Sequence, residues 1–298
     1  MNGKIVVITG GNDGIGFATA KELALQGANL ILVCRNEQKA QLAMQRLHTE
    51  TGTNNATYVL ADLLSFASVR QAAAQIIACT AAIDVLINNA GATFSRFELG
   101  EDGYEKTITT NHLSHFLLTG LLLPHIQRST YARVINVASH SHFGFGVSMD
   151  IESFTRNKGY FIMRAYAQSK LANVMFTLDL AQKLQNTHVT VNALHPGTIK
   201  TDIGTKSAMS SFHAWAWSVW SGVVGLSIEQ GAKTGIYLTS SPDVAGISGR
   251  YYSCTGKLNR IWDKPKAVAY SKLADDADMR AKLWQTSEKA CGIVFPNG

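Results

Sequence analysis

Short runs of apolar, mostly β-branched residues alternate along the chain with longer stretches that have helical periodicity. Runs of this kind, without regular polar positions, are typical of parallel strands whose two faces are both covered by helices. The alternation therefore predicts an α/β fold with a Rossmann-type, doubly wound parallel sheet. About seven strands are expected, at residues 5–9, 28–34, 57–60, 85–88, 133–137, 189–194 and 249–252.

Helix-capping residues predict several helix boundaries. Gly27 is typical of the stop that follows a helix, and Ser65 predicts the start of a helix that runs to about residue 79. Asp102 together with Glu105 resembles a capping box, which predicts the start of the next helix.

No internal repeat, low-complexity stretch or proline-rich linker divides the 298 residues. We therefore expect a single domain over residues 1–298. Residues 274–290 predict a terminal amphipathic helix whose inward-facing side chains are Met279, Leu283 and Trp284.

The composition narrows the class of protein. With 46% hydrophobic and 16% charged residues, the chain is not of the disordered class. The net charge is +6, but lysine and arginine are scattered without runs, so we expect a solvated surface and no nucleic-acid partner. The four widely spaced cysteines form no C-x-x-C pair, which predicts reduced thiols in a cytoplasmic protein. No signal peptide is expected, because the first apolar run spans only residues 5–9.

Residues 207–228 contain no Asp, Glu, Lys or Arg and are rich in tryptophan. The segment is long enough to span a bilayer, but His213, its serines and glycines, and its place within a continuing fold argue against a transmembrane helix.

A glycine-rich turn lies between the first strand and the first helix, where residues 9–16 read Thr-Gly-Gly-Asn-Asp-Gly-Ile-Gly. A pyrophosphate needs close backbone, amide N–H groups and a helix N-terminus, which glycines at this place allow. The dinucleotide contacts expected here are Gly10, Asn12, Asp13, Gly14, Ile15 and Gly16.

The end of the second strand bears on the choice of dinucleotide. NAD sites place a carboxylate there for the ribose 2′-hydroxyl, about 20 residues past the glycines. This chain has Arg35 and Asn36 instead, and a cation suits a 2′-phosphate, so NADP(H) is preferred over NAD(H). The alternative is that Arg35 is a surface arginine. Asp62, with Leu63 beside it, is expected at the adenine, although Asp62 fits a plain turn equally well.

Tyr166 and Lys170 lie four residues apart in the helical stretch 164–184, and therefore on one face. A phenol of ordinary pKa near 10 is a poor proton donor and acceptor at neutral pH, whereas a neighbouring ammonium stabilises its phenolate. The pair predicts a tyrosine that exchanges a proton with an alcohol or carbonyl oxygen.

Further polar residues follow the ends of other strands. Ser139 closes the fifth strand, at the sheet edge where ligands bind, and its hydroxyl is suited to hold a substrate oxygen. Asn89, Ala90 and Gly91 close the fourth strand with a glycine turn toward the cofactor, and Asn111 lies in the helix that follows.

With these elements in order, the chain resembles the short-chain dehydrogenase/reductase family over nearly its whole length: T-G-x-x-x-G-x-G, N-N-A-G, Asn, Ser and Y-x-x-x-K. The resemblance implies a catalytic tetrad of Asn111, Ser139, Tyr166 and Lys170, with Lys170 also holding the nicotinamide ribose. It further implies that Pro196, Gly197, Thr198 and Thr201 contact the cofactor, and that hydride is transferred on the B face.

Three stretches resemble the retinol-dehydrogenase-like subgroup in particular: residues 110–119, 169–173 and 195–198. Unlike many of its members, this chain is expected to lack an N-terminal membrane anchor. Light-dependent protochlorophyllide reductases share much of the pattern but carry a cysteine at the position of Thr198.

The family folds a lid over the substrate after the sixth strand, which places the lid at about residues 198–228. Three interpretations of the tryptophan-rich part at 212–228 stay open: an aromatic wall for a bulky apolar substrate, a packing helix, and a peripheral membrane contact. The residues expected to line the substrate are His140, His142, Phe212 and Trp215.

No metal is expected, because neither an H-E-x-x-H motif nor a carboxylate accompanies the paired histidines His112 and His115. A serine hydrolase is disfavoured because the chain has no G-x-S-x-G elbow. The sequence thus predicts an NADP(H)-dependent oxidoreductase that transfers hydride between nicotinamide and a bulky apolar or aromatic carbonyl or alcohol. A nucleotide-sensing protein and a membrane scaffold are the rival interpretations, and a homo-oligomer stays open.

Overall fold

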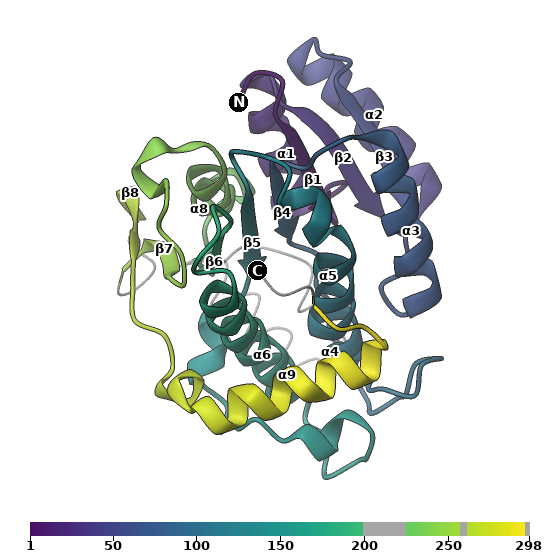
Figure 1. Ribbon diagram of the computed structural model, residues 1–298, viewed down its shortest axis with the longest axis vertical. Helices are drawn as coiled ribbons and strands as arrows, with labels where there is room; N and C mark the ends of the chain where they lie inside the picture. Colours follow the sequence, from purple (N-terminus) through teal and green to yellow (C-terminus); the bar gives the residue numbers. More distant parts are fainter. Residues whose placement is uncertain (199–224, 257–260, 296–298) are drawn as a thin grey trace.

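The computed structural model describes residues 1–198, 225–256 and 261–295. Within these ranges one sheet of eight strands runs through the centre of the molecule, in the order β3-β2-β1-β4-β5-β6-β7-β8 (Figure 1). Neighbouring strands are parallel except for the antiparallel pair β7–β8. The strands are β1 (Ile5–Thr9), β2 (Asn29–Cys34), β3 (Ala56–Leu60), β4 (Val85–Asn88), β5 (Arg133–Val137), β6 (Thr190–His195), β7 (Tyr251–Thr255) and β8 (Ile261–Ala267).

This arrangement confirms the predicted α/β fold with a parallel, doubly wound sheet. The chain builds outward from β1 to β3 in one direction and from β4 to β8 in the other, so the strand order reverses between β1 and β4. In sheets of this kind ligands bind outside the carboxyl ends of the strands at such a reversal. We therefore expect ligand-binding residues in the loops that follow β1, β4, β5 and β6.

Helices cover both faces of the sheet because each face presents apolar strand residues (Figure 1). Buried residues of α1, α2 and α8 form one core, and those of α3, α5, α6 and α9 form the other. The helices are α1 (Gly14–Leu25), α2 (Glu37–Thr51), α3 (Phe66–Cys79), α4 (Lys106–Ile108), α5 (Ser114–Ile126), α6 (Ile162–Lys183), α8 (Ile228–Ser240) and α9 (Ala277–Cys291). A π-helical turn, η1 (Thr109–Leu113), joins α4 to α5.

Aromatic side chains hold α9 against α5 and α6. The ring centroids of Trp284 and Phe116 are 5.1 Å apart, those of Phe116 and Phe176 are 5.2 Å apart, and those of Phe295 and Phe116 are 4.7 Å apart. Leu283 and Trp284 are buried, as the amphipathic pattern predicted. Burial of such large apolar groups stabilises the packing by about 1.5–3 kcal/mol per side chain.

The predicted strand count was wrong by one, because β8 was missed. This strand lies at the edge of the sheet, contains Pro265, and carries three exposed charged residues, Asp263, Lys264 and Lys266, so its sequence has no continuous apolar run. The seventh strand also begins at Tyr251 rather than at Gly249, whose φ of 70° lies in the left-handed region. Its last residues were missed because Ser253 and Thr255 are polar, although both are buried.

The predicted boundary at residue 65 is confirmed, whereas the capping box at residues 102–105 is wrong. Ser65 caps α3. Glu105 alone caps α4, since its carboxylate accepts hydrogen bonds from the backbone N–H groups of Thr107 and Ile108. The carboxylate of Asp102 instead accepts from the N–H of Phe66, 2.8 Å away, at the start of α3. A tertiary contact thus places the Asp102 carboxylate at the start of α3 and not at the start of α4, the helix that follows it in the sequence.

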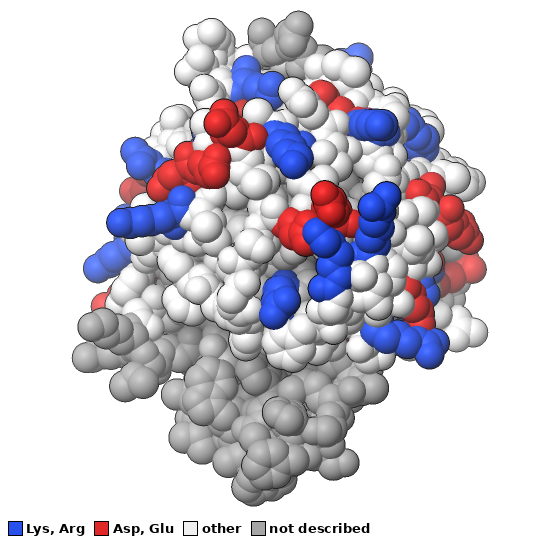
Figure 2. Space-filling model, turned by 90° about the horizontal axis from the view of Figure 1, so that it is seen from below, with Lys and Arg blue, Asp and Glu red and all other residues white. Residues whose placement is uncertain are grey.

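None of the helices within the described ranges is long and apolar enough to cross a membrane. Most of the segment expected as a lid, residues 199–224, lies outside those ranges. Figure 2 shows that, on the face seen there, lysine and arginine side chains are interspersed with carboxylates and with broad uncharged areas.

Candidate active site

The turn after β1 has the geometry of a dinucleotide cradle. Gly10 adopts φ 65° and donates its N–H to the carbonyl of Val33, 2.8 Å away. A Cβ on Gly16 would lie 2.2 Å from the carbonyl oxygen of Gly10, so only glycine fits where α1 meets the turn. The carboxylate of Asp13 caps α1 by accepting from the N–H of Gly14. The turn fits a pyrophosphate, because glycine backbone meets the N-terminus of α1 there.

The turn after β4 docks directly on this cradle. The side-chain amide of Asn89 donates to the carbonyl oxygen of Thr9, 2.8 Å away. The backbone N–H groups of Asn89 and Ala90 donate to the Thr9 hydroxyl at 2.9 and 3.0 Å. The N-N-A-G motif therefore sets the shape of the glycine turn as well as closing its own strand.

The residues expected at the adenosine end lie beside β2 and β3. Arg35 is exposed at the end of β2, where its guanidinium is accessible to a ligand. Asn36 caps α2 by accepting from the N–H of Lys39. One carboxylate oxygen of Asp62 accepts from the N–H of Leu64, which corresponds to the turn interpretation of this residue. Leu63 is buried beside it.

Tyr166 and Lys170 lie on one face of α6, at the carboxyl edge of the sheet. The Lys170 ammonium is 5.6 Å from the centre of the Tyr166 ring, and it donates to the carbonyl of Val137, 2.9 Å away. Lys170 is 3% exposed, and burial lowers its pKa to about 8. A lysine in this environment exchanges protons near neutral pH.

The phenol of Tyr166 is not acidified in the protein alone. Burial raises its pKa, and a side-chain hydrogen bond with Ser139 lowers it by less. The Lys170 ammonium, which lies over the ring and is hydrogen bonded to a carbonyl oxygen, is not among the groups that lower this pKa.

Asn111 and Gly91 complete this cluster. A Cβ on Gly91 would lie 3.4 Å from the Lys170 nitrogen and 3.5 Å from the Asn111 side-chain oxygen, so the three residues converge. The Asn111 carboxamide is fully used: it exchanges two hydrogen bonds with the backbone of Ala92 and donates to the Ser169 hydroxyl. Within the protein, Asn111 therefore ties the β4 turn to α6.

The histidines expected at the substrate lie just after Ser139. His142 is buried and contacts the Ser139 carbonyl through Nδ1, while its Nε2 has no hydrogen-bond partner. His140 is exposed. Gly197 adopts φ 86° and donates its N–H to His195 Nδ1, and the Thr198 carbonyl accepts from Leu226 at 2.8 Å. Thr201, Phe212 and Trp215 lie outside the described residues.

The sequence did not identify Tyr251 as part of this neighbourhood. Its ring centroid lies 5.0 Å from that of His142 and 5.9 Å from that of His195, and it is close enough to Tyr166 to interact electrostatically. Its hydroxyl is buried without a partner. Tyr251 belongs to no motif, and the one signal for it was its place in β7, next to β6 in the sheet.

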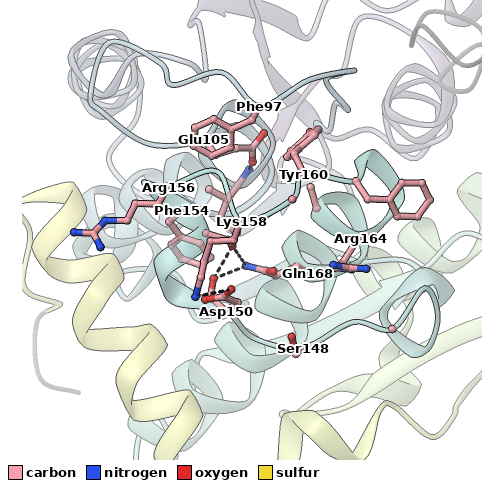
Figure 3. Close-up of a pocket in the computed structure, with 16 residues that line it drawn as sticks. Phe97, Glu105, Ser148, Asp150, Phe154, Arg156, Lys158, Tyr160, Arg164 and Gln168 are labelled. Carbon is pink, nitrogen blue, oxygen red and sulfur yellow. Dashed lines mark hydrogen bonds and ion pairs between the residues drawn. The ribbon is translucent and has the colours of Figure 1, made fainter.

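A separate cavity of about 120 Å³ lies on another side of α6 (Figure 3). Gln168, which lines it, is two positions from Tyr166 and therefore points to nearly the opposite side of the helix. Figure 3 shows Gln168 directed toward the loop that carries Asp150 and Lys158. Its amide donates to the carbonyl of Asp150 and to the Ser153 hydroxyl, both at 3.0 Å. These contacts brace the start of α6.

Four buried histidines make the fold sensitive to acid, and we expect the free energy of unfolding to fall below pH 6.5. Burial lowers the pKa values of His112 and His195 to about 3, and of His115 and His142 to about 4. Below pH 6.5 the unfolded chain therefore binds protons that the folded protein excludes. Each histidine contributes up to about 1.4 kcal/mol per pH unit down to its folded-state pKa.

Urea unfolding at pH 7.5 and pH 5.0 measures this loss. His142→Gln is expected to reduce the difference between the two pH values, whereas replacing the exposed His48 by Gln leaves it unchanged. Equal stability of the wild type at both pH values would contradict the prediction.

Comparisons with known proteins identify the family of the chain. The sequence model of the short chain dehydrogenase family matches residues 4–210. Human retinol dehydrogenase 13 is 37% identical over 297 residues, covering 99% of this chain and 86% of that protein. An uncharacterized protein from Mycobacterium paratuberculosis has a similar crystal structure, with a TM-score of 0.78, 31% identity, and coverage of 99% of this chain and 96% of that one.

A third similar protein has a solved structure in complex with a dinucleotide. The Pseudomonas aeruginosa RhlG/NADP active-site complex has a TM-score of 0.67 and 26% identity, and the match covers 84% of this chain and 94% of that one. Since the family match extends from the glycine turn past the helix of Tyr166 and the fold agrees over the whole chain, the protein belongs to the short-chain dehydrogenase family.

Proposed function

We propose that the protein is an NADP(H)-dependent oxidoreductase that transfers hydride between the nicotinamide and a carbonyl or alcohol carbon. The observation that carries this proposal is the convergence of Lys170, Asn111 and Gly91, beside Tyr166, where the strand order reverses. A protein that only sensed nucleotides would have no use for a buried phenol and amine at this place.

The residues of the cradle would hold the dinucleotide. The backbone at residues 10–16 would receive the pyrophosphate, and Lys170 and the turn at Gly91 would lie beside the nicotinamide ribose. Arg35 would pair with a 2′-phosphate, because a guanidinium matches phosphate oxygens in a bidentate fashion. The NADP of the related RhlG complex supports the same preference.

The chemistry of the protein residues follows from their positions. The cofactor supplies or accepts the hydride, and its oxidised ring brings positive charge. In the direction of reduction, Ser139 donates a hydrogen bond to the substrate oxygen, and Tyr166 transfers its proton to that oxygen as hydride adds to the carbon. In oxidation the phenolate removes the proton of the alcohol. Lys170, whose pKa is lowered, returns a proton to Tyr166 after reduction and takes one from it after oxidation.

A bulky apolar or aromatic substrate fits the surroundings of Ser139. The ring of Phe143 contacts those of His140 and His142, and Tyr251 contacts His142. Relatives named for retinol, a long apolar alcohol, support this substrate class. The lid at 198–228, a homo-oligomer, a peripheral membrane contact and a cytoplasmic location stay predictions.

A screen of purified protein against aldehydes and ketones tests the function. NADPH absorbance would be followed for a small polar aldehyde and for a long-chain and an aromatic one, and each assay would be repeated with NADH. We expect a higher kcat/KM for the apolar substrates. Preference for the small polar aldehyde would contradict the substrate class, and the absence of turnover with every carbonyl and alcohol would contradict the oxidoreductase itself.

Arg35→Ala tests the dinucleotide preference. We expect the Kd of NADPH to rise by about tenfold or more while the Kd of NADH changes little, because a charge-assisted contact to a phosphate contributes about 1.5–3 kcal/mol. Titration of protein fluorescence with each dinucleotide measures both constants. Arg128→Ala, at the end of α5, is the control, since Arg128 contacts the carbonyl of Ala81. Equal losses for NADPH and NADH would rule out the 2′-phosphate contact.

A further inference from the structure

His115, near the start of α5, connects the dinucleotide cradle to the π-helical turn that carries Asn111. Its Nε2 is 2.9 Å from the Thr9 hydroxyl, across 106 residues of sequence, and its Nδ1 is 3.1 Å from the carbonyl oxygen of Asn111. The side chain is 2% exposed. Both ring nitrogens of His115 are therefore occupied by hydrogen bonds.

The directions of these hydrogen bonds follow from their partners. A carbonyl oxygen can only accept, so Nδ1 of His115 carries the proton and donates it to Asn111. Nε2 is then an acceptor, and the Thr9 hydroxyl donates to it. The Thr9 oxygen in turn accepts from the backbone N–H groups of Asn89 and Ala90. One neutral imidazole thus organises both turns of the cradle.

The network continues to the catalytic helix. The Asn111 amide donates to the Ser169 hydroxyl at 2.9 Å, and Ser169 donates to the carbonyl of Tyr166 at 2.7 Å. Hydrogen bonds, joined through the backbone and side chain of Asn111, therefore connect the glycine turn of β1 to the turn of α6 that presents the phenol. π-helical turns such as η1 are uncommon and are often found at functional sites.

We propose that His115 is a positioning residue that couples cofactor binding to the placement of Tyr166 and Lys170. Its Nε2 side holds the shape of the dinucleotide cradle, and its Nδ1 side holds Asn111 and, through Ser169, the catalytic helix. This inference rests on the proposed function, because it concerns cofactor affinity and turnover. It assigns a separate effect to each side of the imidazole ring.

Two substitutions separate the two sides. The amide of asparagine reaches about as far as Nδ1 of histidine, whereas the amide of glutamine reaches about as far as Nε2. His115→Gln can therefore still accept from Thr9, and His115→Asn can still donate to the Asn111 carbonyl. His115→Leu does neither. His125→Leu, on the same helix, is the control, because His125 is half-exposed and contacts Arg128.

The readouts are the Kd of NADPH from fluorescence titration, kcat at saturating substrate and cofactor, and the melting temperature. We expect His115→Gln to lower kcat about tenfold with a nearly normal Kd, and His115→Asn to raise the Kd about tenfold with a nearly normal kcat, one net hydrogen bond being worth about 0.5–1.5 kcal/mol. His115→Leu is expected to show both losses.

If the His115 variants lowered only the melting temperature and kept the kcat and Kd of the His125→Leu control, this inference would be wrong while the proposed function would stand. A wild type that turns over no carbonyl or alcohol would remove the proposed function and this inference with it. The NADPH titration distinguishes the two failures, since the effect of His115→Asn on the Kd is measured without turnover.

Discussion

The Tyr166→Phe variant is expected to lose at least ~100-fold in kcat, because general acid–base catalysis by one positioned group contributes about 10²- to 10⁴-fold. Phenylalanine keeps the ring, and with it the contact to Lys170, but removes the only hydroxyl that the proposed chemistry uses for proton transfer. NADPH binding is expected to change little. Steady-state kinetics with an apolar aldehyde and a fluorescence titration with NADPH measure the two effects.

Tyr160→Phe provides a matched control for this prediction. The Tyr160 hydroxyl donates to the carbonyl of Phe94 at 2.7 Å and contacts the Thr107 hydroxyl, beside the cavity on the other side of α6. Its removal is expected to cost about 1 kcal/mol of stability and to leave kcat nearly unchanged. If Tyr166→Phe lost no more activity than Tyr160→Phe, the proton donor would have to be another group.

Gly16→Ala is expected to weaken NADPH binding by about 100-fold, equivalent to ~3 kcal/mol of overpacking. The added Cβ would lie 2.2 Å from the Gly10 oxygen and 2.6 Å from the Asn89 amide nitrogen. The nearest atom is backbone, so the steric conflict is relieved only if the cradle opens. Fluorescence titration with NADPH measures the change, and circular dichroism checks that the variant is folded.

Gly235→Ala is the corresponding control in another helix. A Cβ there would meet the Thr19 side chain at 3.7 Å, which is ordinary contact. Since alanine favours a helix interior by about 0.8–1.0 kcal/mol over glycine, this variant is expected to be folded, to bind NADPH normally and to melt at a higher temperature. Comparable NADPH affinities for the two variants would show that the close approach at Gly16 is not needed.

Local patterns predicted most of the fold because they act over short distances along the chain. The parallel strands are apolar on both faces, and the glycine turn lies directly between β1 and α1, so neither depends on distant residues. The edge strand β8 could not be predicted in this way because solvent, not core, faces most of its side chains. Asp102 was assigned to the wrong helix because its partner, Phe66, lies 36 residues earlier.

The same distinction applies to the candidate site. Tyr166 and Lys170 were expected together from their spacing on one helix, Ser139 was placed at the carboxyl edge of the sheet as the end of a strand, and the family resemblance joined the three. The sequence could not show that His115 contacts Thr9, since no pattern joins positions 106 residues apart. Nor could it show that burial outweighs the hydrogen bond from Ser139 and raises the pKa of Tyr166.

The packing of α9 has a consequence for the order of events during synthesis. When the ribosome has added residue 270, every residue proposed for catalysis has been made, yet α5 and α6 still lack Trp284 and Phe295. His112, one residue after Asn111, also lacks the hydroxyl of Ser287, its partner at 2.9 Å. Nascent chains shortened before α9 would carry every residue of the proposed catalytic set on helices that still lack these packing partners.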